Sequence, residues 1–182
     1  MKTKVNKITA EESILNFFLN NPRREIHLRA LARETNLSPA GILKASKQLI
    51  KDNIIIQKKD KEKNLLILKA NREENNFSSL KRSRNIYALS DCGLLKYLIE
   101  SYERPETIIL FGSYSKGEDM EESDVDIAII TKRNLQLDLK QFEKKIERKI
   151  KILELNKEKI QKQFWQTLAN GIVLYGYLEI PL

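Results

Sequence analysis

Two short motifs in the second half of the chain, each beside a mostly apolar stretch, constrain the fold most. The stretch Thr107–Phe111 is rich in apolar and β-branched residues, which predicts a short buried strand, and Gly112 and Ser113 follow it directly. Asp124 and Asp126 open a second apolar stretch further along. Side chains two positions apart on a strand share a face. Both carboxylates are therefore predicted to lie on one face of a sheet.

The residue types at these positions suit phosphate and cation chemistry. Gly112 has no Cβ, so its backbone can approach a phosphate closely. Ser113 offers a hydroxyl and a backbone N–H where a helix begins, which is a place where anions bind. Lys116 adds a positive charge nearby. Asp124 and Asp126 repel each other unless a cation lies between them, and Mg²⁺ prefers such oxygen ligands.

Residues 111–130 resemble the signature of the DNA polymerase β-like nucleotidyltransferase superfamily: a strand, Gly-Ser, a short helical turn with lysine and glycine, then Ser-Asp-x-Asp and a hydrophobic strand. The resemblance implies a small α/β domain with a short mixed sheet over residues 105–182. It implies ATP or another NTP as donor, Mg²⁺ (or Mn²⁺) as cofactor, and in-line transfer of NMP to a hydroxyl with loss of pyrophosphate. The site residues that it implies are Gly112, Ser113 and Lys116 for nucleotide binding, and Asp124 and Asp126 for catalysis and metal binding.

The third carboxylate of this superfamily, usually supplied by a later strand, is where the sequence departs from the pattern. The next predicted strand covers residues 150–155, and Lys151 stands where minimal members commonly place an acid. Glu154 is the nearby acid, but three positions further along a regular strand it faces the other side. A missing metal ligand removes charge stabilisation from the transition state, so nucleotide binding could persist while transfer became slow.

The first 70 residues show the element order of a winged helix-turn-helix. Thr9 and Glu12 form a capping box before an apolar helical stripe. Ser38 followed by proline is a strong signal for the start of another helix. The predicted elements are helices over residues 9–20, around 26–35 and over 38–52, then strands over 54–58 and 65–68 joined by a polar hairpin tip at 60–64. Residues 8–70 therefore resemble the winged-helix superfamily.

The predicted fold class is α+β, with three segments. Residues 1–70 form the winged helix-turn-helix, residues 71–104 a helical connector, and residues 105–182 the nucleotidyltransferase-like domain. Within the connector we expect a polar loop, a short helix with a break over residues 77–89, and a further helix capped by Ser90. An amphipathic helix is predicted over residues 137–149.

The net charge of +8 lies entirely in the first 70 residues, which hold 15 lysines and arginines against 7 acidic residues. Such an excess favours a polyanion, and DNA is the usual one. In this fold the third helix enters the major groove and the hairpin contacts the DNA backbone. The predicted DNA-binding residues are Ser38, Lys44, Lys47, Lys58, Lys59, Lys61 and Lys63. Because lysines contact phosphates, we expect modest sequence specificity. The alternatives are a dimerisation or protein-docking module.

The cysteine content and the lengths of the apolar runs indicate the cellular compartment that we expect for the protein. The single Cys92 excludes an internal disulfide and fits a reducing compartment. No apolar run approaches the length of a membrane span, and no apolar segment typical of a signal peptide follows the basic start. We therefore expect a cytoplasmic protein without a membrane partner.

Two functional hypotheses remain open from the sequence. In the first, the C-terminal domain transfers NMP to an acceptor, such as a protein toxin, because minimal nucleotidyltransferases of this type are often antitoxins that adenylylate a toxin. In the second, the chain is a DNA-binding transcriptional regulator whose nucleotidyltransferase domain is weakly active or inactive and senses a nucleotide or a partner. Lys151 favours the second, while the intact Gly-Ser and Asp-x-Asp motifs favour the first. A homodimer that binds paired half-sites is compatible with both.

Overall fold

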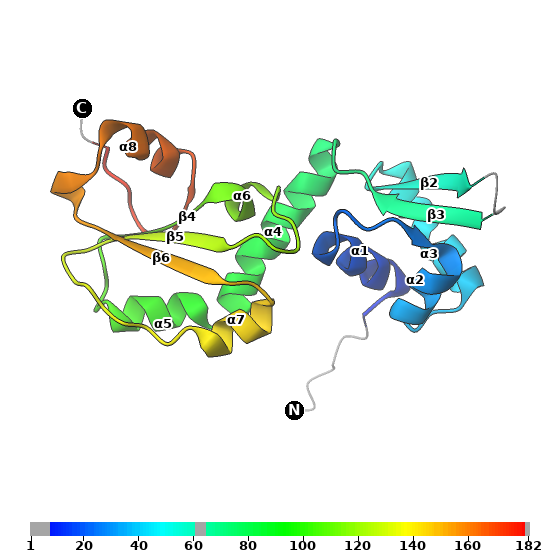
Figure 1. The fold of residues 1–182 in the computed structure, drawn as a ribbon, viewed down its shortest axis with the longest axis horizontal. Coiled ribbons are helices and arrows are strands. Elements are labelled where there is room, and N and C mark those ends of the chain that lie inside the picture. Colours follow the sequence, from blue (N-terminus) through cyan, green and yellow to red (C-terminus); the bar gives the residue numbers. More distant parts are fainter. Residues whose placement is uncertain (1–7, 61–64, 181–182) are drawn as a thin grey trace, which may run out of the picture. The chain divides into compact units, whose positions relative to one another are not determined.

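A computed structural model describes residues 8–60 and 65–180, and it divides the chain into two compact units, Met1–Ser78 and Ser79–Leu182. Each unit has its own buried apolar core, as expected of separate domains. Figure 1 shows helices and a small sheet in each unit. The α+β fold class predicted from the sequence is confirmed.

The N-terminal unit has the winged helix-turn-helix architecture. Its elements are α1 (Ala10–Asn20), β1 (Ile26–His27), α2 (Leu28–Glu34), α3 (Pro39–Lys51), β2 (Ile55–Asp60) and β3 (Leu65–Ala70). The three strands pair antiparallel in the order β1-β3-β2. Phe18, Leu31, Ile42 and Leu68 are completely buried and join the three helices to the sheet. Burial of such apolar side chains is the main stabilising contribution to this small domain.

Local signals place the starts of α1 and α3 where the sequence predicts them. The Thr9 hydroxyl accepts a hydrogen bond from the Glu12 N–H, and the Glu12 carboxylate accepts one from the Thr9 N–H. The Ser38 hydroxyl accepts a hydrogen bond from the Gly41 N–H at 3.0 Å and so caps α3. The prediction that Ile26 belongs to the second helix is wrong. Ile26 pairs with Leu68 in β1, because a backbone partner on β3 is available there.

The C-terminal unit contains a mixed four-stranded sheet with helices on both faces. Its elements are α4 (Asn75–Asp91, which begins in the first unit), α5 (Leu94–Ser101), β4 (Thr107–Phe111), α6 (Gly112–Lys116), β5 (Val125–Ile130), α7 (Lys140–Ile146), β6 (Ile150–Leu155), η1 (Lys157–Lys159), α8 (Lys162–Ala169) and β7 (Ile172–Gly176). The strand order is β6-β5-β4-β7. β5 and β6 run parallel and the other pairs antiparallel, which is the predicted mixed sheet.

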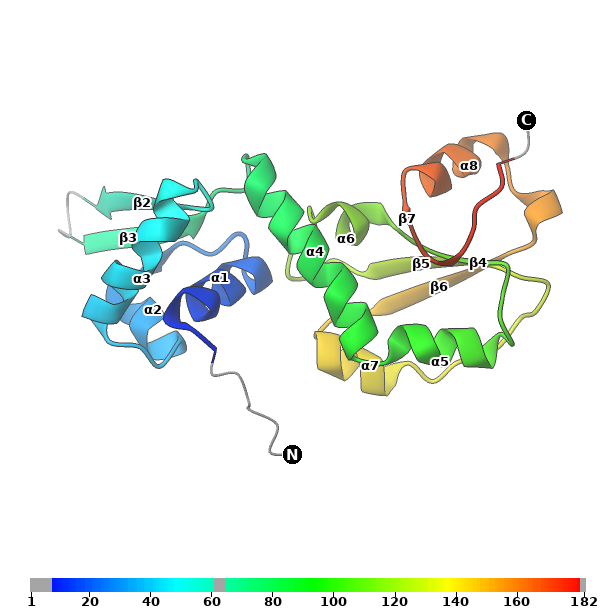
Figure 2. The ribbon, with the colours of Figure 1, turned by 180° about the vertical axis from the view of Figure 1, so that it is seen from behind.

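The two faces of this sheet are covered by different helices. In Figures 1 and 2, α5 and α7 lie on one face and α8 on the other. Val125, Ile127 and Ile129 of β5 pack into the cluster on the α5 and α7 face. Ala128 and Ile130 pack into the cluster on the α8 face. This alternation follows from the period of two along a strand and fixes which face each polar residue of β5 occupies.

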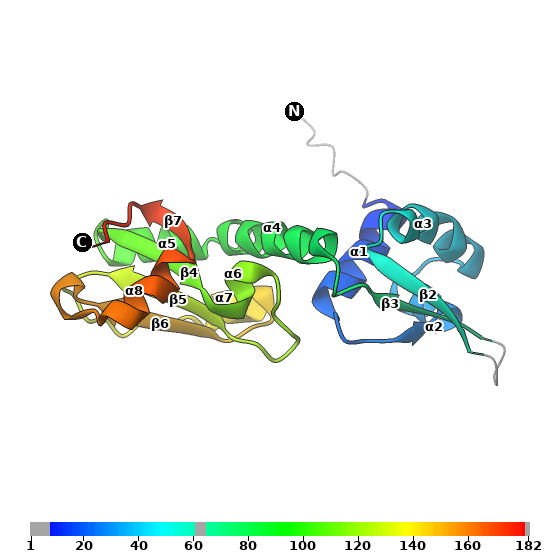
Figure 3. The ribbon, with the colours of Figure 1, turned by 90° about the horizontal axis from the view of Figure 1, so that it is seen from above.

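Three helix predictions for residues 77–149 are corrected by the structure. The expected break within residues 77–89 is absent, since α4 is one uninterrupted helix over Asn75–Asp91 (Figure 3). Ser90 lies inside α4, and the next helix instead begins after Gly93, whose left-handed φ of 86° makes the turn. The helix predicted over residues 137–149 is shorter, Lys140–Ile146, because Glu147 adopts a left-handed φ of 54°.

Candidate functional site

The Gly-Ser and Asp-x-Asp motifs come together at one end of the β4–β5 pair. Phe111, the last residue of β4, is the register partner of Asp126 on β5. Gly112 follows with a left-handed φ of 73°, and a Cβ placed on it would lie 2.6 Å from Asp126 Oδ2. Since real Cβ atoms do not approach another atom so closely, a larger residue at this position would force the Asp126 carboxylate to shift. The structure therefore brings the two predicted halves of the site into contact.

Asp124 and Asp126 lie on the α8 face of the sheet. Asp126 has the same parity along β5 as Ala128 and Ile130, which pack toward α8. Asp124 stands two positions earlier, directly before the strand begins. Burial raises the pKa of Asp126 above its ordinary value, Lys151 opposes this increase, and the negative charge of Asp124 adds to it. The two carboxylates thus form the like-charged pair that the sequence predicts.

Lys151 is the third charged group of this site. It is the register partner of Asp126 on the parallel strand β6. Its Nζ lies 2.5 Å from Asp124 Oδ2, and the Lys151 and Asp124 side chains are 67% and 30% exposed. This hydrogen bond and the charge of Asp124 raise the pKa of Lys151. An ammonium group therefore occupies the position beside Asp126 where a third carboxylate would be expected from the resemblance.

Glu154, the acid that the sequence offers three residues after Lys151 on β6, lies on the opposite face of the sheet. Its carboxylate Oε1 accepts a hydrogen bond from the Tyr102 hydroxyl at 2.6 Å and another from the Leu135 N–H at 2.7 Å. Burial, followed by this hydrogen bond, raises the pKa of Tyr102. Glu154 thus connects the segment after β5 to Tyr102 at the end of α5. Its carboxylate does not join Asp124 and Asp126 as a third acid of the site.

The remaining predicted nucleotide-binding residues lie on the short helix α6. Ser113 is half-buried in its first turn, beside Gly112, and Lys116 is exposed at its last position. The Ser115 hydroxyl donates to the Gly112 carbonyl at 2.8 Å and closes the turn. Gly112 and Ser113 thus share the end of β4 with the carboxylate pair, whereas Lys116 lies at the far end of α6. Their roles toward a nucleotide stay predictions.

A buried polar network behind α6 was not predicted from the sequence. Lys81 Nζ lies 2.9 Å from Asp119 Oδ2, with side chains only 2% and 1% exposed. The Asn85 amide donates to Asp119 Oδ1 at 2.7 Å and to the Tyr114 carbonyl at 2.9 Å. Burial lowers the pKa of Lys81, and the charge of Asp119 opposes that shift. The network joins α4 to α6 and to the loop that leads to Asp124.

One sequence signal points to this network. Phe77, Lys81, Asn85 and Leu89 recur every four residues and are all buried. Residues four apart share one face of a helix, so two polar side chains within an apolar stripe indicate buried hydrogen-bonding partners elsewhere in the chain.

The fit of Mg²⁺ to this site can be judged from the donor set. Two carboxylates share one face, but the Lys151 ammonium already bonds Asp124, so an ion bridging both acids would have to displace it. Within residues 8–60 and 65–180, no group of three or more His, Cys, Asp or Glu residues is arranged to hold a metal ion. The residues present therefore fit a resident divalent ion poorly.

The predicted DNA-binding residues that the structure describes lie on α3 and β2. Lys44 and Lys47 are exposed on α3, and Lys58 and Lys59 are exposed on β2. Lys61 and Lys63 lie outside the described residues. The hydroxyl of Ser38 is engaged in capping α3.

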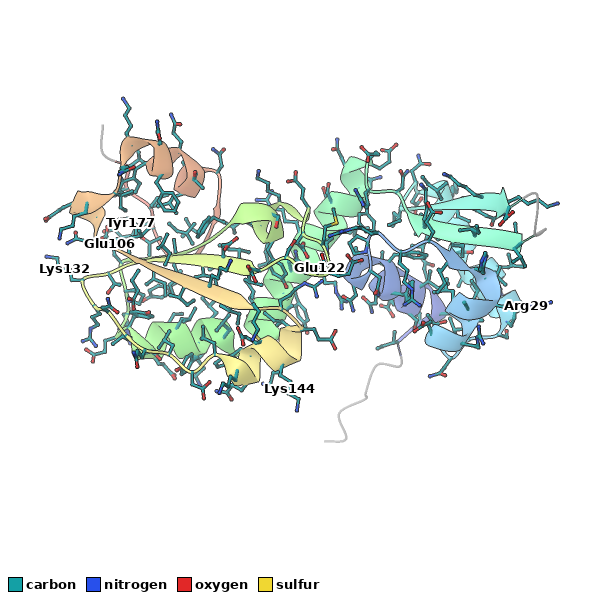
Figure 4. The ribbon with its side chains drawn as sticks, viewed as in Figure 1. Arg29, Glu106, Glu122, Lys132, Lys144 and Tyr177 are labelled. Carbon is teal, nitrogen blue, oxygen red and sulfur yellow. The ribbon has the colours of Figure 1, made fainter. Side chains whose placement is uncertain are left out.

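The potential for base recognition on α3 is small. Its glutamine, Gln48, donates to both carboxylate oxygens of Asp52 at 2.8 and 2.9 Å. Arg29 is exposed on the neighbouring α2 (Figure 4). The surface of α3 thus presents mainly lysines, which suit phosphate contacts.

The C-terminal unit also has clefts away from the carboxylate pair. One of about 450 Å³ is lined by residues including Arg104, Glu106, Lys132 and Lys157, at the end of the sheet opposite to Gly112. Figure 4 labels Glu106 and Lys132 at that end. Lys157 bonds Glu106 at 2.6 Å and Glu179 at 2.9 Å, so part of the positive charge there is already neutralised.

One comparison with known proteins supports the C-terminal domain. Residues 94–179 match the family model described as "Polymerase beta, Nucleotidyltransferase", which supports the nucleotidyltransferase domain that the motifs predict. The crystal structure of the adhesin competence repressor AdcR from Streptococcus pyogenes is similar at 18% identity and a TM-score of 0.36, covering 56% of this chain and 72% of that one. The comparison with curated proteins finds no match. No helix in the described part of the chain is long and apolar enough to cross a membrane.

Proposed function

We propose that this chain is a DNA-binding regulator whose nucleotidyltransferase domain binds a nucleotide and transfers NMP weakly or not at all. The observation that carries the proposal is the contact of 2.5 Å between Lys151 Nζ and Asp124 Oδ2. A carboxylate bonded to an ammonium group is a poorer ligand for a catalytic cation than a free one, because the cation must first displace the ammonium.

Nucleotide binding is supported by the backbone at the end of β4. Gly112 packs against Asp126 without a Cβ, and Ser113 lies in the following turn. A nucleotide would place its phosphates against this turn, with Lys116 as an additional positive charge. The assignment of residues 105–182 to nucleotide binding is part of the proposal, as is ATP or another NTP as the ligand.

DNA binding is supported by the architecture and charge of the first 70 residues. The winged-helix unit presents Lys44, Lys47, Lys58 and Lys59 as exposed side chains, and its net charge is positive. We propose that these lysines contact DNA phosphates, that the protein acts in the cytoplasm, and that it forms a homodimer when it binds paired half-sites.

A second candidate function, a nucleotidyltransferase, is favoured by the close approach of Gly112 to Asp126. In this case a hydroxyl acceptor attacks the α-phosphorus of an NTP and pyrophosphate leaves. A protein acceptor such as a toxin fits the antitoxin relationship inferred from the sequence. This candidate retains the Mg²⁺ or Mn²⁺ inferred for Asp124 and Asp126, on the condition that Lys151 turns away.

The two candidates are separated by one labelling experiment combined with DNA retention. The full chain is incubated with Mg²⁺, radiolabelled ATP and candidate acceptors, beside an Asp124→Asn/Asp126→Asn variant. Label transfer that this variant loses supports the transferase. ATP binding without transfer, together with DNA retention that weakens as salt increases, supports the regulator. If wild-type protein binds neither ATP nor DNA, both candidates are wrong.

A further inference from the structure

The position of Lys151 has a consequence for the cation dependence of the site. Lys151 lies beside Asp126 in the β5–β6 register, on the same face, and bonds Asp124. One ammonium group therefore lies next to both carboxylates. A nearby positive charge stabilises the ionised forms of a like-charged carboxylate pair, and here the protein supplies that charge itself.

The Lys151 ammonium group and a divalent ion compete for the carboxylates of Asp124 and Asp126. Lys151 brings a single charge and three N–H donors, and it cannot coordinate a metal while protonated. A lysine side chain carries its positive charge at neutral pH. A divalent ion between Asp124 and Asp126 would lose one free carboxylate ligand and would also be repelled by the ammonium group.

We propose that Lys151 excludes a divalent cation from the Asp124–Asp126 pair, so that nucleotide binding at the Gly112–Ser113 turn does not depend on Mg²⁺. The second half of this statement rests on the proposed nucleotide-binding function, whereas the first half concerns the cation alone. Because Lys151 is 67% exposed, the exclusion is a competition between charges rather than a steric block. Removing the charge therefore opens the site.

The direct test measures Mn²⁺ binding to the full chain by electron paramagnetic resonance of the free ion, without nucleotide. The variants are Lys151→Met, which removes the charge, and Lys151→Glu, which places a third carboxylate beside Asp126. Lys149→Met is the matched control, since Lys149 lies two residues away, is exposed, and bonds Glu143 instead, at 3.1 Å. Circular dichroism checks that every variant is folded.

The expected order of Mn²⁺ affinity follows from the charges. Wild type and Lys149→Met bind weakly and alike, Lys151→Met binds at least about tenfold more tightly, and Lys151→Glu more tightly again. Adding Asp126→Asn to Lys151→Glu abolishes the gain. If wild type binds Mn²⁺ as tightly as Lys151→Glu, or if neither folded Lys151 variant gains affinity, the exclusion is overturned.

A parallel ATP titration keeps this inference separate from the proposed function. Wild-type protein is titrated with ATP in the presence of EDTA and again with excess Mg²⁺, and equal affinity is expected. Binding that requires Mg²⁺ overturns the cation independence. If ATP binds under neither condition, the nucleotide function and the cation independence are wrong, while the Mn²⁺ series still decides whether Lys151 excludes the cation.

Discussion

Two lysine–aspartate pairs in the C-terminal unit have the same chemistry and opposite surroundings. Lys81 and Asp119 lie 2.9 Å apart, with side chains 2% and 1% exposed. Lys151 and Asp124 lie 2.5 Å apart, but their side chains are 67% and 30% exposed. The first pair is enclosed between α4 and the loop after α6, whereas the second faces solvent at the end of the sheet that carries Gly112.

This difference in burial predicts that the buried pair stabilises the fold, whereas the exposed pair affects which ligands the site binds. Removing one partner of a buried pair leaves an uncompensated charge in a medium that cannot solvate it. Removing one partner of an exposed pair leaves a charge that water solvates, with little effect on stability. Lys81 should therefore matter for folding, and Lys151 for what the site binds.

The largest expected effect is the loss of the buried pair. Lys81→Met removes the positive charge and strands Asp119, so the C-terminal unit should lose about 3–5 kcal/mol of unfolding free energy. Urea denaturation followed by circular dichroism measures this loss. Lys96→Met is the control, because Lys96 pairs with Glu100 at 3.8 Å on an exposed helix face, and it should cost about 0.5 kcal/mol or less. Equal losses in the two variants would contradict the structural assignment of Lys81.

Gly112 and Gly93 also differ in their surroundings, one beside the site and the other in open space. Gly112 and Gly93 both have left-handed φ angles, 73° and 86°, but an added Cβ meets Asp126 at 2.6 Å only at Gly112 and nothing within 4 Å at Gly93. Alanine at either position should cost about 1–2 kcal/mol of backbone strain. Only Gly112→Ala should also displace the Asp126 carboxylate and weaken ATP binding, by about tenfold or more. Isothermal titration of both variants measures the difference, and equal ATP affinity would place the nucleotide elsewhere.

The helices and strands were predictable where local signals decide them. The capping box at Thr9, the Ser38 cap and the apolar runs of β4 and β5 act within a few residues, and the structure has these elements in place. The two-residue strand at Ile26 was missed because its backbone depends on pairing with Leu68, more than forty residues away. Nothing in the sequence near Ile26 states that a partner exists.

The site was predictable to the same extent. The period of two along a strand placed Asp124 and Asp126 on one face and Glu154 on the other side from Lys151. The ion pair of Lys151 with Asp124 could not be predicted, because it depends on the parallel register of β5 and β6. The pairing of Lys81 with Asp119 likewise requires knowing which loop lies against α4.

The exposed lysines of the winged-helix unit differ from both lysine–aspartate pairs, because we propose that they contact DNA. Replacing Lys58 and Lys59 by alanine should lower the slope of log affinity against log salt for DNA by about 2, close to 0.9 per phosphate contact. Fluorescence anisotropy at several salt concentrations measures the slope. Lys132→Ala, an exposed lysine of the other unit, should leave the slope unchanged. A similar decrease in both variants would mean that net charge alone acts on DNA.

The smallest expected effect is that of Lys151 on stability. Lys151→Met should leave the unfolding free energy at neutral pH almost unchanged, because water solvates Asp124 once the ammonium group is gone. Asp124 raises the pKa of Lys151 above the ordinary 10.5, so the pair contributes a small stabilisation to the folded state. The stabilising contribution of the pair is complete below that ordinary value and is lost as the pH rises through the higher value in the folded state.

Any stability difference between wild type and Lys151→Met should therefore shrink above a pH of about 10.5, which urea midpoints measured at neutral and at strongly alkaline pH can detect. A large loss of stability in Lys151→Met at neutral pH would place Lys151 with Lys81 as a structural residue. In that case the exposed pair would be a fixed part of the fold, and a gain in Mn²⁺ affinity on removing it could no longer be attributed to charge competition alone.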